Sequence, residues 1–164
     1  MIKVGIITAS DKGSRGERED LSVEVIKELI ATIDGQVIAY EIVPDEQPIL
    51  EVKLKEYSDE LGLDLVLTTG GTGLAVRDIT PEATLNIAEK QVPGIGELMR
   101  KISFEATPHG ILSRGIAVIR GQTLIINLPG SPKAVRECLG GILPALPHGI
   151  QILKGEAGEC GQRG

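Results

Sequence analysis

The chain has 164 residues, of which 41% are hydrophobic, and a formal net charge of −6 at pH 7. This length and apolar content predict one globular domain and leave too little chain for two. Aromatic residues make up only 2% of the chain. The scarcity of rings for base stacking and the acidic charge balance both argue against nucleic acid as a partner.

Cysteine usage and the N-terminal segment indicate a cytoplasmic protein. Cys138 and Cys160 lie far apart and form no CxxC pair, so the sequence predicts neither a disulfide framework nor a metal knuckle. The first residues resemble a strand, and no apolar run has the length of a signal peptide or a membrane span. We therefore expect no membrane as a partner.

The first apolar stretch, residues 2–9, is rich in β-branched side chains and predicts a buried strand. The strand stops at Ser10 and Asp11, and a polar segment containing two glycines continues to Asp20. At the carboxyl end of a strand, such a segment is either a lid over a binding site or a solvated connection. The residues alone leave both interpretations open.

Strands and helices alternate in the next part of the chain. Apolar residues recur every four positions over 21–33, which predicts an amphipathic helix that ends with Gly35 in the left-handed conformation. A second strand is expected over 36–43, and Pro48 suits the first turn of a helix that continues to about Leu61. Helices of this length connect parallel strands by right-handed crossovers, so the pattern predicts half of a doubly wound α/β fold.

The central apolar run, residues 65–68, is typical of a strand buried on both faces inside a parallel sheet. Its carboxyl end, where open α/β sheets bind ligands, continues as Thr69, Gly70, Gly71, Thr72 and Gly73. Glycine lets backbone N–H groups approach an anion, and the threonine hydroxyls add donors. The run therefore predicts an anion cradle, although a plain strand-to-helix turn would also use these glycines. The sequence lacks the Lys-Ser or Lys-Thr of a Walker P-loop and the third glycine of a dinucleotide fingerprint.

The remaining elements complete a mixed sheet. Helices are expected over 80–89, opened by a Thr-Pro pair, and from about 96 to 104. The β-rich runs 116–119 and 123–128 flank a short turn that contains Gly121. They predict a hairpin that forms an antiparallel edge on a mostly parallel sheet.

A second turn of glycine and proline follows the hairpin, with Pro129, Gly130 and Ser131 leading into a helix that begins at Pro132. The N–H groups at a helix N-terminus offer an anion site. Lys133 is then either a phosphate ligand or a solvated charge. Further along, the glycine-rich, polar segment 155–164 predicts a flexible tail after a single domain spanning residues 1–154.

Two carboxylates fall near the glycine loop. Asp45 follows the second strand, and Asp78 follows the glycines closely enough to enter the same cleft. Two carboxylates beside phosphate-binding glycines suit magnesium-nucleotide chemistry, because Mg²⁺ prefers oxygen ligands. The alternatives are that Asp45 caps the helix beginning near Pro48 and that Asp78 pairs with Arg77.

Three segments jointly resemble the molybdenum cofactor biosynthesis family that contains MogA, MoaB and the gephyrin G domains. They are residues 68–73 (TTGGTG), 77–84 (RDITPEAT) and 127–133 (NLPGSPK), and the resemblance covers the chain from Val4 to about Leu153. Because the chain carries both PDEQ at 44–47 and RDITPEA, it looks most like the MogA branch, the molybdopterin adenylyltransferases.

This resemblance implies a three-layer α/β fold, a homotrimer, and transfer of AMP from ATP to the terminal phosphate of molybdopterin, with Mg²⁺ as cofactor. It implies that Asp45 and Asp78 are catalytic and hold the metal. Residues 70–73 with Ser131 and its neighbours would bind the nucleotide, and Ser10, Asp11 and Thr69 would lie near the pterin. A downstream partner would be a molybdenum insertase. Two features differ from the family pattern. Ser131 stands where some relatives have Gln or Asn, and the segment from Gly141 to Ile150 is shorter than in MogA proteins that carry an extra turn there.

Two other functions stay open from the sequence. One is a MoaB-like protein that binds molybdopterin or a related pterin without transferring AMP. The other is a generic Rossmann-like nucleotide module with a different substrate, which the glycine loops alone would permit.

Overall fold

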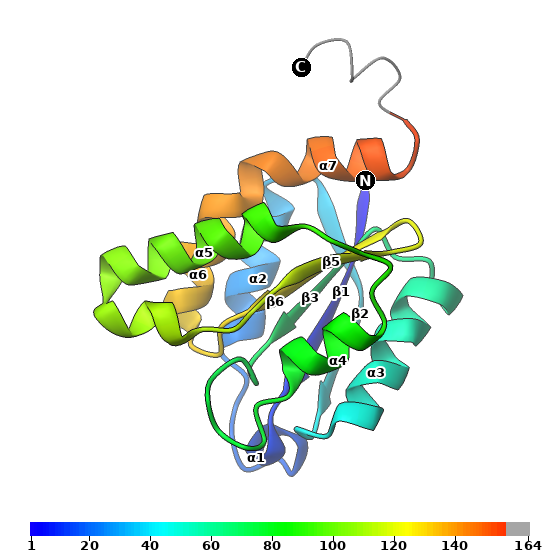
Figure 1. Cartoon of the computed structure of the whole chain (residues 1–164). Helices are drawn as coiled ribbons and strands as arrows, with labels where there is room; N and C mark the ends of the chain where they lie inside the picture. The colour runs from blue at the N-terminus through cyan, green and yellow to red at the C-terminus, as the bar shows by residue number, and fades with distance from the viewer. Residues whose placement is uncertain (157–164) are drawn as a thin grey trace.

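The computed structural model describes residues 1–156 and contains a six-stranded sheet with the strand order β2-β1-β3-β6-β5-β4 (Figure 1). The strands are β1 (Ile2–Ala9), β2 (Gly35–Val43), β3 (Leu65–Thr69), β4 (Lys90–Gln91), β5 (Ala117–Arg120) and β6 (Thr123–Leu128). The α-helices are α1 (Asp11–Ser14), α2 (Ser22–Ala31), α3 (Gln47–Lys55), α4 (Thr80–Asn86), α5 (Pro93–Ala106), α6 (Pro132–Ile142) and α7 (Leu146–Leu153). A π-helical turn, η1 (Glu56–Glu60), extends α3, and two 3₁₀ turns are η2 (Pro108–Leu112) and η3 (Leu143–Ala145).

The sheet is parallel on one side and antiparallel on the other. β1 pairs in parallel with β2 and β3, and β3 pairs in parallel with β6. β5 is antiparallel to both β6 and β4. The predicted hairpin is therefore confirmed, but β4 lies outside it at the edge. β4 could not be predicted from the sequence, because its two residues are both exposed and carry no apolar pattern.

Helices cover both faces of the sheet, which gives the three-layer architecture visible in Figure 1. α2, α5, α6 and α7 contribute to one buried cluster, and α3, η1 and α4 contribute to the other. β3 shows why the sheet forms as predicted: Leu65 and Leu67 face the first cluster, whereas Val66 faces the second. An apolar strand without alternation suits a sheet that is covered on both faces.

The end of α2 differs from the expectation. Asp34, and not Gly35, adopts the left-handed conformation, with φ of 58°. Gly35 instead begins β2, and a Cβ there would lie 2.8 Å from the carbonyl oxygen of Ile30. The glycine is therefore required for a close backbone approach and not for a positive φ.

Other boundaries also differ. α5 begins at Pro93 and not near Gly96, since proline suits the first helical position. The polar segment after β1 contains α1, and α7 follows α6 with Pro147 in its first turn. Most of the predicted tail, residues 157–164 with Cys160, lies outside the described residues. Within residues 1–156, no helix combines the length and hydropathy needed to cross a bilayer.

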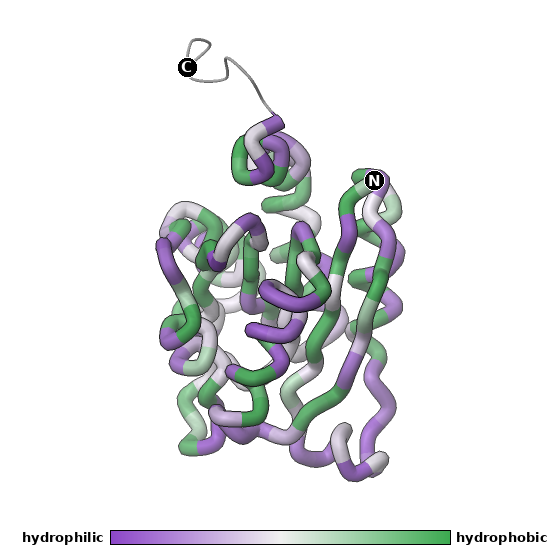
Figure 2. Tube along the Cα trace, turned by 90° about the vertical axis from the view of Figure 1, so that its right-hand side faces the viewer, coloured by the Kyte–Doolittle hydropathy of each residue, from purple (hydrophilic) through white to green (hydrophobic). Residues whose placement is uncertain are grey.

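The parallel strands all end at one edge of the sheet. β1, β2, β3 and β6 run in the same direction, so their carboxyl ends meet at the lower edge in Figure 1, beside α1. Figure 2 shows that the loops at this end include many hydrophilic residues, whereas the strands above them are largely apolar. This edge holds the candidate site.

Candidate functional site

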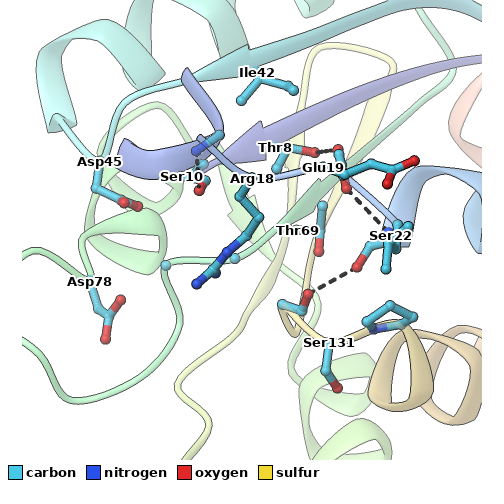
Figure 3. Close-up of a pocket in the computed structure, with 18 residues that line it drawn as sticks. Thr8, Ser10, Arg18, Glu19, Ser22, Ile42, Asp45, Thr69, Asp78 and Ser131 are labelled. Carbon is cyan, nitrogen blue, oxygen red and sulfur yellow. Dashed lines mark hydrogen bonds between the residues drawn. The ribbon is translucent and has the colours of Figure 1, made fainter. Parts of the chain in front are cut away.

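A cavity of about 650 Å³ opens at the carboxyl edge of the sheet (Figure 3). Residues from the ends of β1, β2, β3 and β6 and from the segment before α2 surround it. The lining residues are Thr8, Ala9, Ser10, Gly13, Arg18, Glu19, Asp20, Leu21, Ser22, Ile42, Asp45, Thr69, Gly70, Gly71, Asp78, Gly130, Ser131 and Pro132. The size and mixed lining suit a small-molecule ligand.

The glycine loop has no room for side chains. Gly70 and Gly71 both have positive φ, at 89° and 70°. A Cβ on Gly70 would lie 2.5 Å from the carbonyl oxygen of Ala9, and a Cβ on Gly71 would lie 2.2 Å from Thr80 Oγ1. The chain therefore needs glycine here for its conformation and for close packing, and the bare backbone is left facing the cavity.

Hydrogen bonds join the loops around the cavity. Thr69 Oγ1 donates to the carbonyl oxygen of Pro129 over 2.6 Å, which ties the end of β3 to the end of β6. Ser22 Oγ donates to the carbonyl oxygen of Gly130 over 2.9 Å. Ser131 caps α6 by accepting a hydrogen bond from the N–H of Ala134. These contacts make the cavity wall a connected frame.

The Asp45 carboxylate is held through one of its two oxygens. Its Oδ2 accepts a hydrogen bond from the N–H of Asp11 over 3.0 Å, whereas its Oδ1 is buried without a hydrogen-bond partner. Burial raises the pKa of the Asp45 carboxyl above its usual value. The alternative role as a helix cap is wrong, because Glu46 is the N-cap residue of α3 and no side chain caps that helix.

Arg77 pairs with Asp11 and not with Asp78. Its Nε and Nη2 donate to the two carboxylate oxygens of Asp11 over 2.6 and 2.9 Å. This hydrogen-bonded pair, with the N–H of Asp45, lowers the pKa of Asp11 to about 2. The alternative pairing of Asp78 with its neighbour Arg77 is therefore wrong, and the Asp78 carboxylate stays at the cavity.

Asp78 is positioned by its own turn and by Arg114. Asp78 Oδ2 accepts a hydrogen bond from the N–H of Ala75 over 2.9 Å. Arg114 donates to the carbonyl oxygens of Asp78 and Gly73 over 2.7 and 2.9 Å, and it pairs with Glu82 at 2.6 Å. Arg114, which no sequence motif indicates, thus holds both ends of the loop between Gly73 and Asp78.

Unpartnered oxygens near Gly71 fit a hard cation. Asp45 Oδ1 and Thr80 Oγ1 are both buried without a hydrogen-bond partner, and both point at the place where a Cβ of Gly71 would lie, at 3.3 and 2.2 Å. Mg²⁺ takes oxygen ligands of this type and usually keeps water or substrate phosphates as further ligands. Within residues 1–156, no group of three His, Cys, Asp or Glu side chains forms a complete metal site. A cation held by Asp45 and Asp78 would therefore need ligands from a bound phosphate.

The cavity contains many of the predicted site residues, but not all of them. It brings together Ser10, Asp45, Thr69, Gly70, Gly71, Asp78, Gly130 and Ser131. The residues that do not line it are Asp11, Thr72, Gly73, Pro129 and Lys133. Several of their polar groups are engaged by other residues: the Asp11 carboxylate accepts from Arg77, the Thr72 and Gly73 carbonyls accept from Arg114, and the Pro129 carbonyl accepts from Thr69. The Lys133 side chain is exposed on α6.

The wall formed by the end of β1 and the segment before α2 contains residues that were not predicted as site residues, among them Thr8, Arg18 and Asp20. Asp20 anchors this wall, since its Oδ2 accepts from Thr8 Oγ1 over 2.6 Å and from the Tyr40 hydroxyl. Burial, followed by this hydrogen bond, raises the pKa of Tyr40. The sequence signal for this wall is the polar segment that follows β1, since such a segment at a strand end can form part of a binding site.

A three-layer α/β domain with a cavity of mixed polar and apolar lining at the carboxyl ends of its parallel strands defines a small-molecule-binding protein of the doubly wound class. The family described as "Probable molybdopterin binding domain" matches residues 5–148. The chain therefore belongs to this family, as the resemblance implied.

Curated relatives share much of the sequence. The chain is 48% identical over 156 residues to a molybdopterin adenylyltransferase of Helicobacter pylori strain J99, a match that covers 94% of this chain and 89% of that protein. It is 42% identical over 168 residues to the molybdopterin adenylyltransferase of Escherichia coli K12, covering 94% and 86% of the two chains.

Solved structures confirm the fold. A structure of the molybdopterin biosynthesis enzyme MoaB from Thermus thermophilus superposes with a TM-score of 0.90 at 53% identity, covering 94% of this chain and 98% of that chain. The tungsten cofactor synthesizing protein MoaB from Pyrococcus furiosus superposes with a TM-score of 0.83 at 39% identity, covering 96% and 98%.

Proposed function

We propose that this protein is a molybdopterin adenylyltransferase that transfers AMP from ATP to the terminal phosphate of molybdopterin and releases pyrophosphate. The observation that carries the proposal is the meeting of Asp45, Asp78 and the Gly70-Gly71 loop in one cavity. Relatives that cover 94% of the chain at 42 to 48% identity and bear this enzyme name support the same activity.

The reaction joins two anions, so positioning and charge neutralisation are the main demands on the protein. A phosphate oxygen of molybdopterin attacks the α-phosphorus of ATP. The bond from that phosphorus to the oxygen bridging to the β-phosphorus breaks, and the electron pair leaves with pyrophosphate. The backbone around Gly70 and Gly71 has no side chains of its own, and its N–H groups are suited to binding the phosphoryl oxygens.

Mg²⁺ is the cofactor that the site residues fit. Asp45, through its unpartnered Oδ1, and Asp78 would hold the ion, with phosphate oxygens of the nucleotide completing its ligands. When bound, the ion would supply charge neutralisation for the phosphates. Asp45 and Asp78 are in this sense the proposed catalytic residues.

The other assignments belong to the same proposal. The nucleotide is assigned to the glycine loop and the Gly130-Ser131 turn, and the pterin is assigned to the side of Ser10 and Thr69. Asp11 acts from behind the cavity through its contact with Asp45. The protein works in the cytoplasm as a homotrimer and delivers its product to a molybdenum insertase.

The test is formation of adenylylated molybdopterin and pyrophosphate by the purified full chain given molybdopterin, ATP and Mg²⁺. We expect product that disappears when the metal is chelated. Asp45→Asn and Asp78→Asn should each lower kcat by roughly 100-fold, as expected for loss of a group that organises transition-state charge. Asp59→Asn is the matched control, because Asp59 pairs with Arg120 and does not line the cavity. Wild-type rates in both cavity variants would contradict the proposed roles.

A second candidate is a MoaB-like protein that binds molybdopterin without transferring AMP. The observation that supports this candidate is the 53% identity to the MoaB structure from Thermus thermophilus. This candidate predicts molybdopterin binding that ATP and Mg²⁺ do not change, with no adenylylated product. The adenylyltransferase instead predicts release of one pyrophosphate for each molybdopterin consumed.

A further inference from the structure

Arg18 differs from the other arginines of residues 1–156 because it has no ion pair and no hydrogen bond. The others are all engaged, in ion pairs with carboxylates or, for Arg100, with the carbonyl oxygen of Gly115. Arg18 is nevertheless a lining residue of the 650 Å³ cavity. An arginine without a partner beside a cavity retains all its donors for a ligand.

The Arg18 side chain is directed into the cavity. In the view of Figure 3 it reaches downward, with its guanidinium between Asp78 on one side and Thr69 and Ser131 on the other. The carboxylate-bearing residues that line the cavity are Glu19, Asp20, Asp45 and Asp78. Among the lining residues, Arg18 carries the one cationic side chain, and Lys133 does not reach the cavity.

The positive charge of Arg18 offsets part of the negative charge that lines the cavity. A cavity with four carboxylate side chains repels a phosphorylated ligand unless positive groups offset them. Asp20 is already engaged by Thr8 and Tyr40, and Asp45 and Asp78 suit a cation. The backbone N–H groups of the glycine loop carry only partial charges, and Arg18 supplies the full positive charge among the side chains that line the cavity.

We propose that Arg18 is a phosphate-binding residue of this cavity, whose guanidinium binds phosphoryl oxygens of the ligand as a fork. The inference rests on the proposed function only for the identity of the phosphorylated ligands. The phosphate belongs either to the nucleotide or to the terminal group of the pterin, and both present the same chemistry to a guanidinium.

The neighbouring Arg15 provides a matched control. It lies on the same exposed segment but pairs with Glu17 at 2.9 Å and does not line the cavity. Removing either side chain deletes one positive charge from the same segment, so a general electrostatic effect would act on both variants. A specific contact with phosphate would act on Arg18 alone.

The experiment measures binding by calorimetry of pyrophosphate, ATP with Mg²⁺, and molybdopterin to the full chain. For at least one of these ligands, Arg18→Ala should weaken binding by roughly 10- to 100-fold, the range of a charge-assisted contact. The ligand affinity of Arg18→Lys should lie between those of Arg18→Ala and wild type, because lysine keeps the charge but loses the two-pronged hydrogen bonding of the guanidinium. Arg15→Ala should stay within about two-fold of wild type, as expected for an exposed pair. Thermal unfolding of each variant shows that it is folded.

The pattern of losses identifies the phosphate. Weaker ATP and pyrophosphate binding with unchanged molybdopterin binding assigns Arg18 to the nucleotide, and the reverse assigns it to the pterin phosphate. Arg18→Ala with wild-type affinity for all three ligands would overturn the inference. Because binding needs no turnover, a wild-type chain that shows Arg18-dependent binding but no AMP transfer would refute the proposed function alone. An active wild type with unchanged KM values in Arg18→Ala would refute only the role of Arg18.

Discussion

Asp11 and Asp45 exchange hydrogen bonds: the backbone N–H of each residue donates to the carboxylate of the other, and both bonds measure 3.0 Å. The two residues lie 34 positions apart, so this exchange joins the start of α1 to the loop between β2 and α3. Arg77 then holds the Asp11 carboxylate from the outside. The arrangement orients Asp45 toward the cavity without using Asp45 Oδ1.

Asp11→Ala should therefore reduce activity through Asp45. We expect kcat/KM to fall by roughly 10-fold, because the carboxylate that positions Asp45 is lost while the ligand contacts remain. Arg136→Ala is the control, since it breaks an exposed ion pair with Glu28 and should leave the activity unchanged. Steady-state kinetics check both variants. Equal rates for Asp11→Ala and wild type would show that Asp45 is oriented without the Asp11 carboxylate, through the backbone N–H of residue 11 alone.

Asp45 should also impose a pH-dependent cost on folding. Burial raises the pKa of Asp45 in the folded state, so folding favours the protonated carboxyl. The resulting stabilisation is fully present below the ordinary carboxyl pKa of about 4 and is lost as the pH rises through the folded pKa. Asp45→Asn removes this cost. The variant should melt at a higher temperature than wild type at neutral pH, and the difference should vanish in acid.

The same melting experiment reports on the metal. Mg²⁺ with a nucleotide should raise the melting temperature of wild type by binding the native state, and Asp45→Asn should lose most of that rise. Asp59→Asn should behave as wild type, because its carboxylate pairs with Arg120 outside the cavity. An identical response of Asp45→Asn and wild type would argue against Asp45 as a metal ligand.

Gly71→Ala tests the packing of the glycine loop. The substitution adds a methyl group 2.2 Å from Thr80 Oγ1 at a φ of 70°. We expect a loss of about 2–3 kcal/mol in the free energy of unfolding and a large fall in activity. Gly62→Ala is the matched control, because Gly62 has φ of 59° and nothing within 4 Å of the added Cβ. It should cost only about 1 kcal/mol, the conformational part of the penalty.

Asn127 links the sheet to α4. Its Nδ2 donates to Thr68 Oγ1 and Thr84 Oγ1 over 3.0 and 2.9 Å, its Oδ1 accepts from the N–H of Ile116, and the side chain is fully buried. Asn127→Ala removes these three hydrogen bonds, although Thr84 Oγ1 keeps its bond to the Thr80 carbonyl oxygen, so denaturant unfolding should show a loss of about 2–4 kcal/mol. A loss as small as that of Arg136→Ala would show that water replaces the amide.

Local sequence patterns were sufficient for most of the elements. The apolar run before Thr69, the four-residue spacing in α2 and the two runs flanking Gly121 each report the period of one element and its burial. They failed where the pattern was too short or the decisive contact was distant. β4 has two exposed residues, and Gly35 is explained by the carbonyl of Ile30 and not by its own φ.

The candidate site divides in the same way. The sequence by itself determined the family, the fold class, the glycine loop and the two aspartates, because these lie in contiguous motifs at strand ends. Only the tertiary structure decided that Arg77 pairs with Asp11, 66 positions away, that Arg114 supports Gly73, and that Arg18 faces the cavity without a partner. The physical reason is that the strand order β2-β1-β3-β6 brings together loops that are distant in sequence, and local periodicity carries no information on which side chains then meet.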